Sequence, residues 1–190
     1  MNKLLQLIVA ILLISQTSFY SQNEAVKEAF LYLNKVRANP SSYSKEVGVS
    51  LSGIKSRHAL KWNDTLAKVA QAKAEDLAKN EYFDHVDPKG YGMNYYVAKA
   101  GYKLPKEWLD DPSSNYVESL AAGSANPKAS IIQLLNDNDE PVHNKAGHRV
   151  HLLGIDEFFG KGVDIGIGWV NKPNSEYTTY LVVVIARHTW

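Results

Sequence analysis

Every residue from Tyr180 to Ala186 is apolar, and three of the seven are valines. Valine, isoleucine and tyrosine favour extended backbone, so the run predicts a β-strand. Side chains alternate between the two faces of a strand, and this strand would therefore be apolar on both. Such a strand must be covered on each side, which is typical of a central strand with helices packed on both faces.

A second strand is predicted immediately before it. Residues Val163 to Trp169 alternate strictly, with four apolar side chains on one face. This pattern predicts a half-buried strand, and Gly166 and Gly168 mark places where another element approaches closely. The short loop from Asn171 to Glu176 then predicts an antiparallel hairpin.

Helical patterns precede these strands. Apolar residues recur with helical spacing over Asn23 to Ala38 and again from about Asp64 to Lys79, where Asn63 or Asp64 is placed to cap the first turn. A third helix is predicted to begin at Asn126-Pro127. Helices first and strands last predict an α/β fold, a three-layer α/β/α sandwich with a central, mainly antiparallel sheet.

The segment from Tyr82 to Ser114 has no clear period and is rich in glycine, proline and tyrosine. An irregular segment of this length in a compact domain is typical of a loop that builds a site. Val97 to Gly101 is the one stretch expected to form a short helix. The tyrosines here either line a groove for a ligand or pack beneath the loop.

The first 21 residues have the layout of a secretory signal peptide. A short positive start leads into the apolar run Leu4 to Ile14, and a small polar tail follows to Ser21. The apolar run is shorter than the roughly 20 residues that a membrane-spanning helix needs. We therefore expect residues 1–21 to be removed and residues 22–190 to form one domain, secreted or held in the periplasm or cell envelope without a stable membrane span.

Charge and cysteine content exclude several classes of protein. Lysine and arginine number 21 and aspartate and glutamate 20, which gives no electrostatic reason to expect nucleic acid as a partner. The chain has no cysteine. Disulfides, thiolate metal ligands, a cysteine nucleophile and a lipid anchor on cysteine are thereby excluded.

Three polar residues stand in distinctive local settings. His148 follows a glycine in Gly147-His148-Arg149, His85 precedes Val86-Asp87-Pro88, and Glu118 begins a small apolar run. We expect these three side chains to meet in one cleft. Two neutral imidazoles with one or two carboxylates are enough to hold Zn²⁺ with an open water position, and a carboxylate beside a histidine would fix its tautomer.

The remaining histidines are expected to be structural or exposed. They are His58, His143, His151 and His188. Arg149 is predicted to pair with a carboxylate or a helix end rather than with a ligand.

Taken in order, these motifs resemble the CAP superfamily, also called SCP or pathogenesis-related-1-like domains, and most of all its bacterial secreted branch. The resemblance rests on the stretch Leu60 to Ala70, then His85, Glu118 to Gly123, Gly147 to Arg149, and Val163 to Gly168. It implies an α/β/α sandwich whose central cleft holds two histidines and acidic residues. In some members the two histidines bind a divalent metal, often zinc, so the implied metal ligands are His85 and His148.

Two positions depart from the family pattern. Ser119 stands where the family has asparagine, so whatever that amide orients is missing or replaced. The second acidic residue of the cleft lies among Asp137, Asp139 and Glu140, and Asp139 is favoured. The predicted site is therefore His85, Glu118 and His148, with Asp139 as the fourth member.

Three functions are compatible with these residues. The leading one is a secreted domain whose cleft binds a divalent metal, a small ligand, a peptide or a component of the cell envelope without turnover. The second is a metal-assisted hydrolase of peptides or cell-wall material, with Glu118 as general base. The third, carriage of a lipid or sterol, is implied only by the resemblance. No H-E-x-x-H, G-x-S-x-G or phosphate-loop motif occurs.

Overall fold

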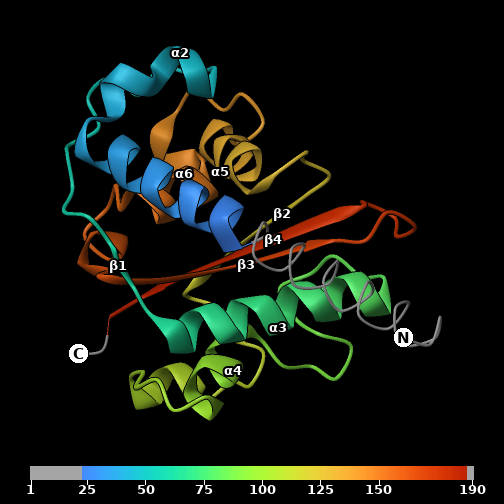
Figure 1. Cartoon of the computed structure of the whole chain (residues 1–190). Coiled ribbons are helices and arrows are strands. Elements are labelled where there is room, and N and C mark those ends of the chain that lie inside the picture. The colour runs from blue at the N-terminus through green and yellow to red at the C-terminus, as the bar shows by residue number, and fades with distance from the viewer. Residues whose placement is uncertain (1–22, 188–190) are drawn as a thin grey trace, which may run out of the picture.

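The computed structural model describes residues 23–187, so the predicted signal peptide lies outside the described residues. One four-stranded sheet runs through the middle of the molecule, with helices on both of its faces (Figure 1). The predicted three-layer α/β/α arrangement is confirmed.

The strands lie in the order β1-β3-β4-β2. Strands β3 (Asp164–Asn171) and β4 (Thr179–Ala186) form the predicted antiparallel hairpin. Strand β2 (Glu118–Ala122) pairs antiparallel with β4, whereas β1 (Lys61–Trp62) pairs parallel with β3. The sheet is thus mixed, and β2 is an edge strand that the sequence did not reveal.

Strand β4 is buried along its whole length, as its two apolar faces predicted. Leu181, Val183 and Ile185 belong to the apolar core on one side of the sheet. The core on the other side contains Tyr180, Val182, Val184 and Ala186. Two separate cores therefore share this one strand.

Strand β3 is buried on both faces over its first six residues, so the prediction of a half-buried strand was wrong. Its glycines explain the difference. A Cβ on Gly166 would lie 2.1 Å from the backbone nitrogen of Ala67, and one on Gly168 would lie 2.3 Å from the backbone of Ala70. The expected close approach is therefore that of a helix, which packs with its backbone directly against the glycine face.

That helix is α3 (Asp64–Asn80), and with α4 (Met93–Lys99) it covers one face of the sheet (Figure 1). The Asn63 side chain accepts a hydrogen bond from Leu66 N at 3.1 Å, as its predicted role as cap requires. The short helix expected near Val97 starts earlier, at Met93. The 3₁₀ turn η2 (Lys106–Leu109) follows it.

The other face is covered by the helix at residues 23–38 and by α5 (Pro127–Asn136) and α6 (Gly147–Leu153). Asn126 caps α5 as predicted, accepting from Ala129 N at 2.9 Å. Smaller elements complete this layer: η1 (Pro40–Tyr43), α2 (Ser44–Val47), η3 (His143–Lys145) and η4 (Phe159–Lys161).

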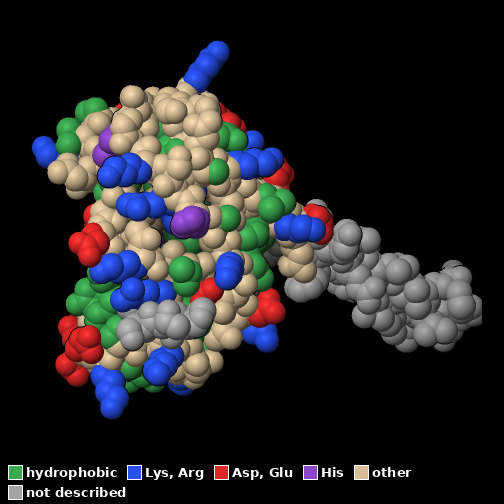
Figure 2. All heavy atoms as spheres, turned by 90° about the vertical axis from the view of Figure 1, so that its left-hand side faces the viewer, with side chains coloured by type: hydrophobic (Ala, Val, Ile, Leu, Met, Phe, Trp, Pro, Cys, Tyr) green, Lys and Arg blue, Asp and Glu red, His purple; other side chains and the backbone are tan. Residues whose placement is uncertain are grey.

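Basic and acidic side chains are interspersed on the face of the molecule that Figure 2 presents. Within residues 23–187, no helix has both the length and the apolar character needed to cross a membrane.

Candidate functional site

Glu118 opens strand β2 and pairs with His85, which lies in the loop after α3. His85 Nδ1 is 2.8 Å from Glu118 Oε2. The Glu118 side chain is completely buried, whereas the imidazole is 43% exposed. His85 Nδ1 also lies 2.9 Å from Asn115 Nδ2. Because an ionised carboxylate can only accept, we assign the Nδ1 proton to the contact with Glu118, which leaves Nε2 as the nitrogen available to a ligand.

Burial raises the pKa of Glu118, while the hydrogen bond from His85 and the positive charge of Lys73 lower it. Oxygen Oε1 of the same carboxylate has no hydrogen-bond partner among the described residues. A buried carboxylate oxygen without a donor is costly, so the ionised form of Glu118 depends on the hydrogen bond from His85 and on the positive charge of Lys73.

Lys73 of α3 belongs to the site region, and no sequence motif singled it out. It is 6% exposed, and Nζ donates to Tyr82 Oη at 3.1 Å and to the carbonyl of His85 at 3.2 Å. Burial lowers its pKa. Helix α3 therefore holds the loop that carries His85. Helical spacing places Lys73 on the same face as the apolar residues of α3, but no sequence pattern linked it to His85.

The second histidine, His148, pairs with Asp137. Oδ1 of Asp137 is 2.8 Å from His148 Nδ1, and Oδ2 accepts from the backbone N–H of His148 at 3.0 Å. Asp137 ends α5 in the left-handed conformation, with φ of 53°. The aspartate thus fixes both the ring and the backbone at the start of α6.

Asp139, the acidic residue favoured from the sequence, lies outside the cleft. Its Oδ1 accepts from Asn136 Nδ2 at 2.9 Å, and Glu140 Oε1 accepts from Val142 N. Residues 137–139 all have positive φ, so the turn reverses tightly. Only Asp137 of the three acidic residues therefore faces His148.

Arg149 holds this turn in place. The side chain is fully buried, with Nε donating to Leu135 O at 2.6 Å, Nη2 to Asn136 O at 2.5 Å and Nη1 to Glu140 O at 2.8 Å. It thereby satisfies carbonyls that the end of α5 leaves without partners. The prediction that Arg149 binds a helix end is confirmed, and this binding positions Asp137.

The two histidine–carboxylate pairs face one cavity of about 250 Å³. His85 comes from the α3/α4 side of the sheet, His148 from the α5/α6 side, and Glu118 from the edge strand between them. The cavity is lined by His85, Asn115, Tyr116, Glu118, Ser119, Asp137, Gly147, His148, His151 and Phe159. The structure therefore brings together the three residues that the sequence singled out, although their chemical role stays a prediction.

Ser119, which replaces the asparagine of the family pattern, shares a hydrogen bond of 2.7 Å with His151 Nδ1. His151 is 3% exposed, and its ring contacts Phe159 at a centroid distance of 4.9 Å. Burial, with smaller contributions from the charges of His148 and Arg37, lowers the pKa of His151 to about 3. His151 is thus a neutral, structural histidine beneath the cleft.

The other histidines lie away from the cavity or outside the described residues. His58 is exposed, His143 Nε2 is 3.2 Å from Ser52 O, and His188 is not described. Of the tyrosines in the irregular segment, Tyr91, Tyr95 and Tyr96 pack on one another. Tyr116 lines the cleft.

The chemistry of the donors decides which metal ions the cleft could hold. Each histidine is anchored through Nδ1 by a carboxylate, an arrangement common for metal-ligating imidazoles. Within residues 23–187, however, no group of three or more histidine or acidic side chains is placed to hold an ion. The described residues therefore do not form a closed structural site, and a divalent ion in this cleft would have to be held by two imidazoles and completed by water or ligand.

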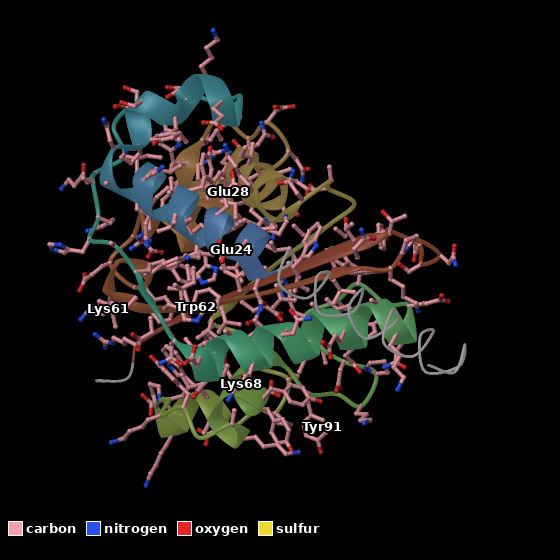
Figure 3. The ribbon with its side chains drawn as sticks, viewed as in Figure 1. Glu24, Glu28, Lys61, Trp62, Lys68 and Tyr91 are labelled. Carbon is pink, nitrogen blue, oxygen red and sulfur yellow. The ribbon has the colours of Figure 1, made fainter. Side chains whose placement is uncertain are left out.

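A larger groove of about 770 Å³ lies elsewhere, between the helix at residues 23–38 and α3. Its walls include Val26, Phe30, Trp62 and Ile167. Figure 3 shows Glu24 on one side of this groove and Lys68 on the other. No sequence pattern singled it out, because the groove exists only where two helices and the sheet meet.

The chain matches a protein-family model and is similar in fold to several solved structures. The model described as "CAP: Cysteine-rich secretory protein family" matches residues 32–185. An extracellular protein containing an SCP domain from Bacillus anthracis is 18% identical, with a TM-score of 0.55 over 87% of this chain. An outer surface protein from Borrelia burgdorferi is 21% identical, with a TM-score of 0.50, and the match covers 86% of this chain and 95% of that one.

The match covers 41% of the Bacillus anthracis protein, so the present chain corresponds to less than half of it. At these identities both structures show a shared fold. No protein with a curated description matches the sequence.

Proposed function

Because the chain belongs to the CAP family, we propose that it is an exported binding protein whose cleft takes up a divalent metal ion or a small ligand without turning it over. The main support is the pair of histidines, each held through Nδ1 by its own carboxylate, at 2.8 Å in both cases. The Nε2 atoms of His85 and His148 are then the donors that the chain offers. A bound divalent ion would supply positive charge to attract an anionic or carbonyl group of the ligand.

The burial of Glu118 favours binding over hydrolysis. A general base has to reach the proton that it removes, directly or through one water. The Glu118 side chain has no exposed area, and its Oε2 faces His85 rather than the open cavity. In this arrangement the carboxylate orients an imidazole.

Export is part of the proposal. It is supported by the signal-peptide pattern in residues 1–21 and by structural neighbours described as extracellular and outer-surface proteins. N-terminal sequencing of the protein recovered from cells and culture medium tests it. A mature chain starting near residue 22 is expected, and an intact Met1 in the cytoplasm would contradict export.

The metal part is tested by elemental analysis of the purified full chain, followed by Zn²⁺ titration calorimetry. Wild type and His58→Ala, which changes an exposed histidine away from the cleft, are expected to bind Zn²⁺ alike. His85→Ala with His148→Ala is expected to lose that binding. Equal Zn²⁺ uptake by the double variant would remove the cleft from consideration as a metal site.

The hydrolase alternative is tested separately. Peptide and peptidoglycan panels are incubated with wild type and with Glu118→Gln, and products are measured by mass spectrometry. We expect no turnover by either protein. Products that form with wild type and disappear with Glu118→Gln would favour hydrolysis.

One observation supports lipid carriage as a second candidate function. The 770 Å³ groove contains the apolar side chains of Val26, Phe30 and Ile167, which suit an acyl chain, while its charged lining is mixed: Lys27 and Lys68 lie beside Glu24, Asp64 and Glu75. Lipid extraction and mass spectrometry of the native protein test this candidate. Co-purifying lipid that is lost in Trp62→Ala, a change at a 40% exposed side chain of the groove, would support it, and the absence of any lipid would count against it.

A further inference from the structure

Strand β2 forms an open edge of the sheet, because β4 is its only strand partner among residues 23–187. In an antiparallel ladder, alternate residues direct both their N–H and C=O groups to the same neighbour. The backbone oxygen of Val117 accepts from β4 at 2.8 Å, and Gly123 N donates to β4 at 3.0 Å. The odd-numbered residues therefore pair with β4, while Glu118, Leu120 and Ala122 direct their backbone groups outward.

The two ends of this outward row are already occupied. Asn115 Oδ1 accepts from Glu118 N at 3.1 Å, and the carbonyl of Ala122 accepts from Gln133 Nε2 at 3.4 Å. Four groups remain between them: the carbonyl of Glu118, both groups of Leu120, and the N–H of Ala122. None of these four has a hydrogen bond to another residue in the range 23–187.

The Glu118 end of the outward row lies in the cleft. There His85 and Asn115 line the cavity from the α3/α4 side, and Asp137 and His148 line it from the α5/α6 side. A single extended chain is thin enough to enter between such walls. A second folded sheet could not pair with β2 in the same way, because the helices that cover it would collide with these walls before the two edges met.

Exposed aromatic side chains lie at each end of the row. At the Glu118 end, Tyr116 is 45% and Phe158 43% exposed, and both contact Trp108. At the Ala122 end, Phe83 is 40% and Tyr177 36% exposed, with ring centroids 5.4 Å apart. Exposed aromatic clusters of this kind mark binding surfaces.

We propose that this edge binds an extended peptide segment as an additional strand of the sheet. The proposal rests on the proposed function of the cleft as a binding site and assigns the class of its ligand. The five residues of β2 span about 14 Å at about 3.4 Å per residue. The ligand is therefore a segment of about six residues, with apolar side chains about four positions apart that reach the two aromatic clusters.

The first test uses an immobilised library of capped hexapeptides with leucine or phenylalanine at positions 1 and 5. The full-length wild-type protein is expected to select a subset of them. Each backbone amide of the best peptide is then methylated in turn. Methylation of amides that face β2 is expected to weaken binding about tenfold or more, and methylation of the alternate amides to have little effect.

The second test uses Ala122→Pro, because proline at this position removes an outward N–H and leaves the ladder with β4 intact. Peptide binding is expected to fall about tenfold or more, while Zn²⁺ uptake at the cleft is unchanged. The matched variant is His85→Ala with His148→Ala, which is expected to lose Zn²⁺ and keep the alternating response to amide methylation. The two variants thus separate failure of the peptide proposal from failure of the metal proposal.

Several results would overturn the inference. They are the absence of any selected peptide, a methylation pattern without alternation, and unchanged peptide binding by Ala122→Pro. Sedimentation that shows wild type dimerising, with the dimer lost in Ala122→Pro, would make a second copy the occupant and would equally overturn it.

Discussion

Acid is expected to destabilise the protein through His151. Its pKa is lowered to about 3 by burial, against about 6.5 for histidine in an unfolded chain. Below about pH 6.5 the unfolded state takes up a proton that the folded state does not bind. The contribution of His151 is therefore fully present above about pH 6.5 and is lost progressively as the pH falls toward 3.

The magnitude follows from the two pKa values. Between pH 7 and pH 5, the unfolded imidazole changes from mostly neutral to almost fully protonated, while the folded one stays neutral. The free energy of unfolding is then expected to fall by about 2 kcal/mol from this residue alone. For a domain of this size the loss corresponds to a fall in Tm of about 4 to 8 °C.

Other groups titrate in the same range, so the test compares variants. Burial raises the pKa of Glu118, and a raised carboxyl pKa works in the opposite direction as the pH falls. Urea unfolding followed by tryptophan fluorescence is measured at pH 7 and pH 5 for wild type, Ser119→Ala and His151→Leu. Ser119→Ala keeps the buried histidine and should keep the full pH dependence.

His151→Leu is expected to be less stable at pH 7, because it leaves the Ser119 hydroxyl without its partner. Its further loss at pH 5 should be smaller than that of wild type by about 2 kcal/mol. Equal losses in wild type and His151→Leu would refute the reasoning, since the histidine would then be accessible to protons in the folded state.

Three further substitutions and one control, Gly147→Ala, test the packing that positions the site, all by urea unfolding. Gly166→Ala places a methyl group against the backbone of α3 and is expected to cost about 3 kcal/mol or more, whereas Gly147→Ala meets open space and should change stability by about 0.5 kcal/mol or less. Arg149→Met leaves three carbonyls without their donor and is expected to cost about 3 kcal/mol, so a near-neutral result would contradict its role at the end of α5. Asn63→Ala removes the cap of α3, with an expected loss of about 1 kcal/mol, and unchanged stability would show that the cap is dispensable.

Local patterns were enough to predict much of the fold. Three features depend only on residues close in sequence and could therefore be predicted. They are the apolar run in β4, the caps at Asn63 and Asn126, and the helical spacing of apolar residues. Strand β2 was missed because it has five residues and begins with a charged glutamate. The burial of β3 was underestimated because Gly166 and Gly168 add no apolar side chain to the sequence pattern. Only the structure shows that the backbone of α3 covers this face.

The candidate site was only partly predictable for the same reason. His85, Glu118 and His148 could be singled out by their local motifs, and the structure places all three around one cavity. The choice between Asp137 and Asp139 depended on three successive residues with positive φ. Aspartate and asparagine predict a turn at these positions, but they do not predict which side chain the turn directs into the cleft. The pairing of Ser119 with His151 required two elements to be packed in three dimensions.

The central claim is that His85 and His148, one from each side of the sheet, act on the same bound group. Imidazole ¹H–¹⁵N NMR spectra of the full-length protein, recorded during Zn²⁺ titration, test it most directly. Both Nε2 signals are expected to shift together with one apparent Kd, and His85→Ala should weaken the response of His148. Two independent responses, or an unchanged His148 response in His85→Ala, would contradict a single shared site.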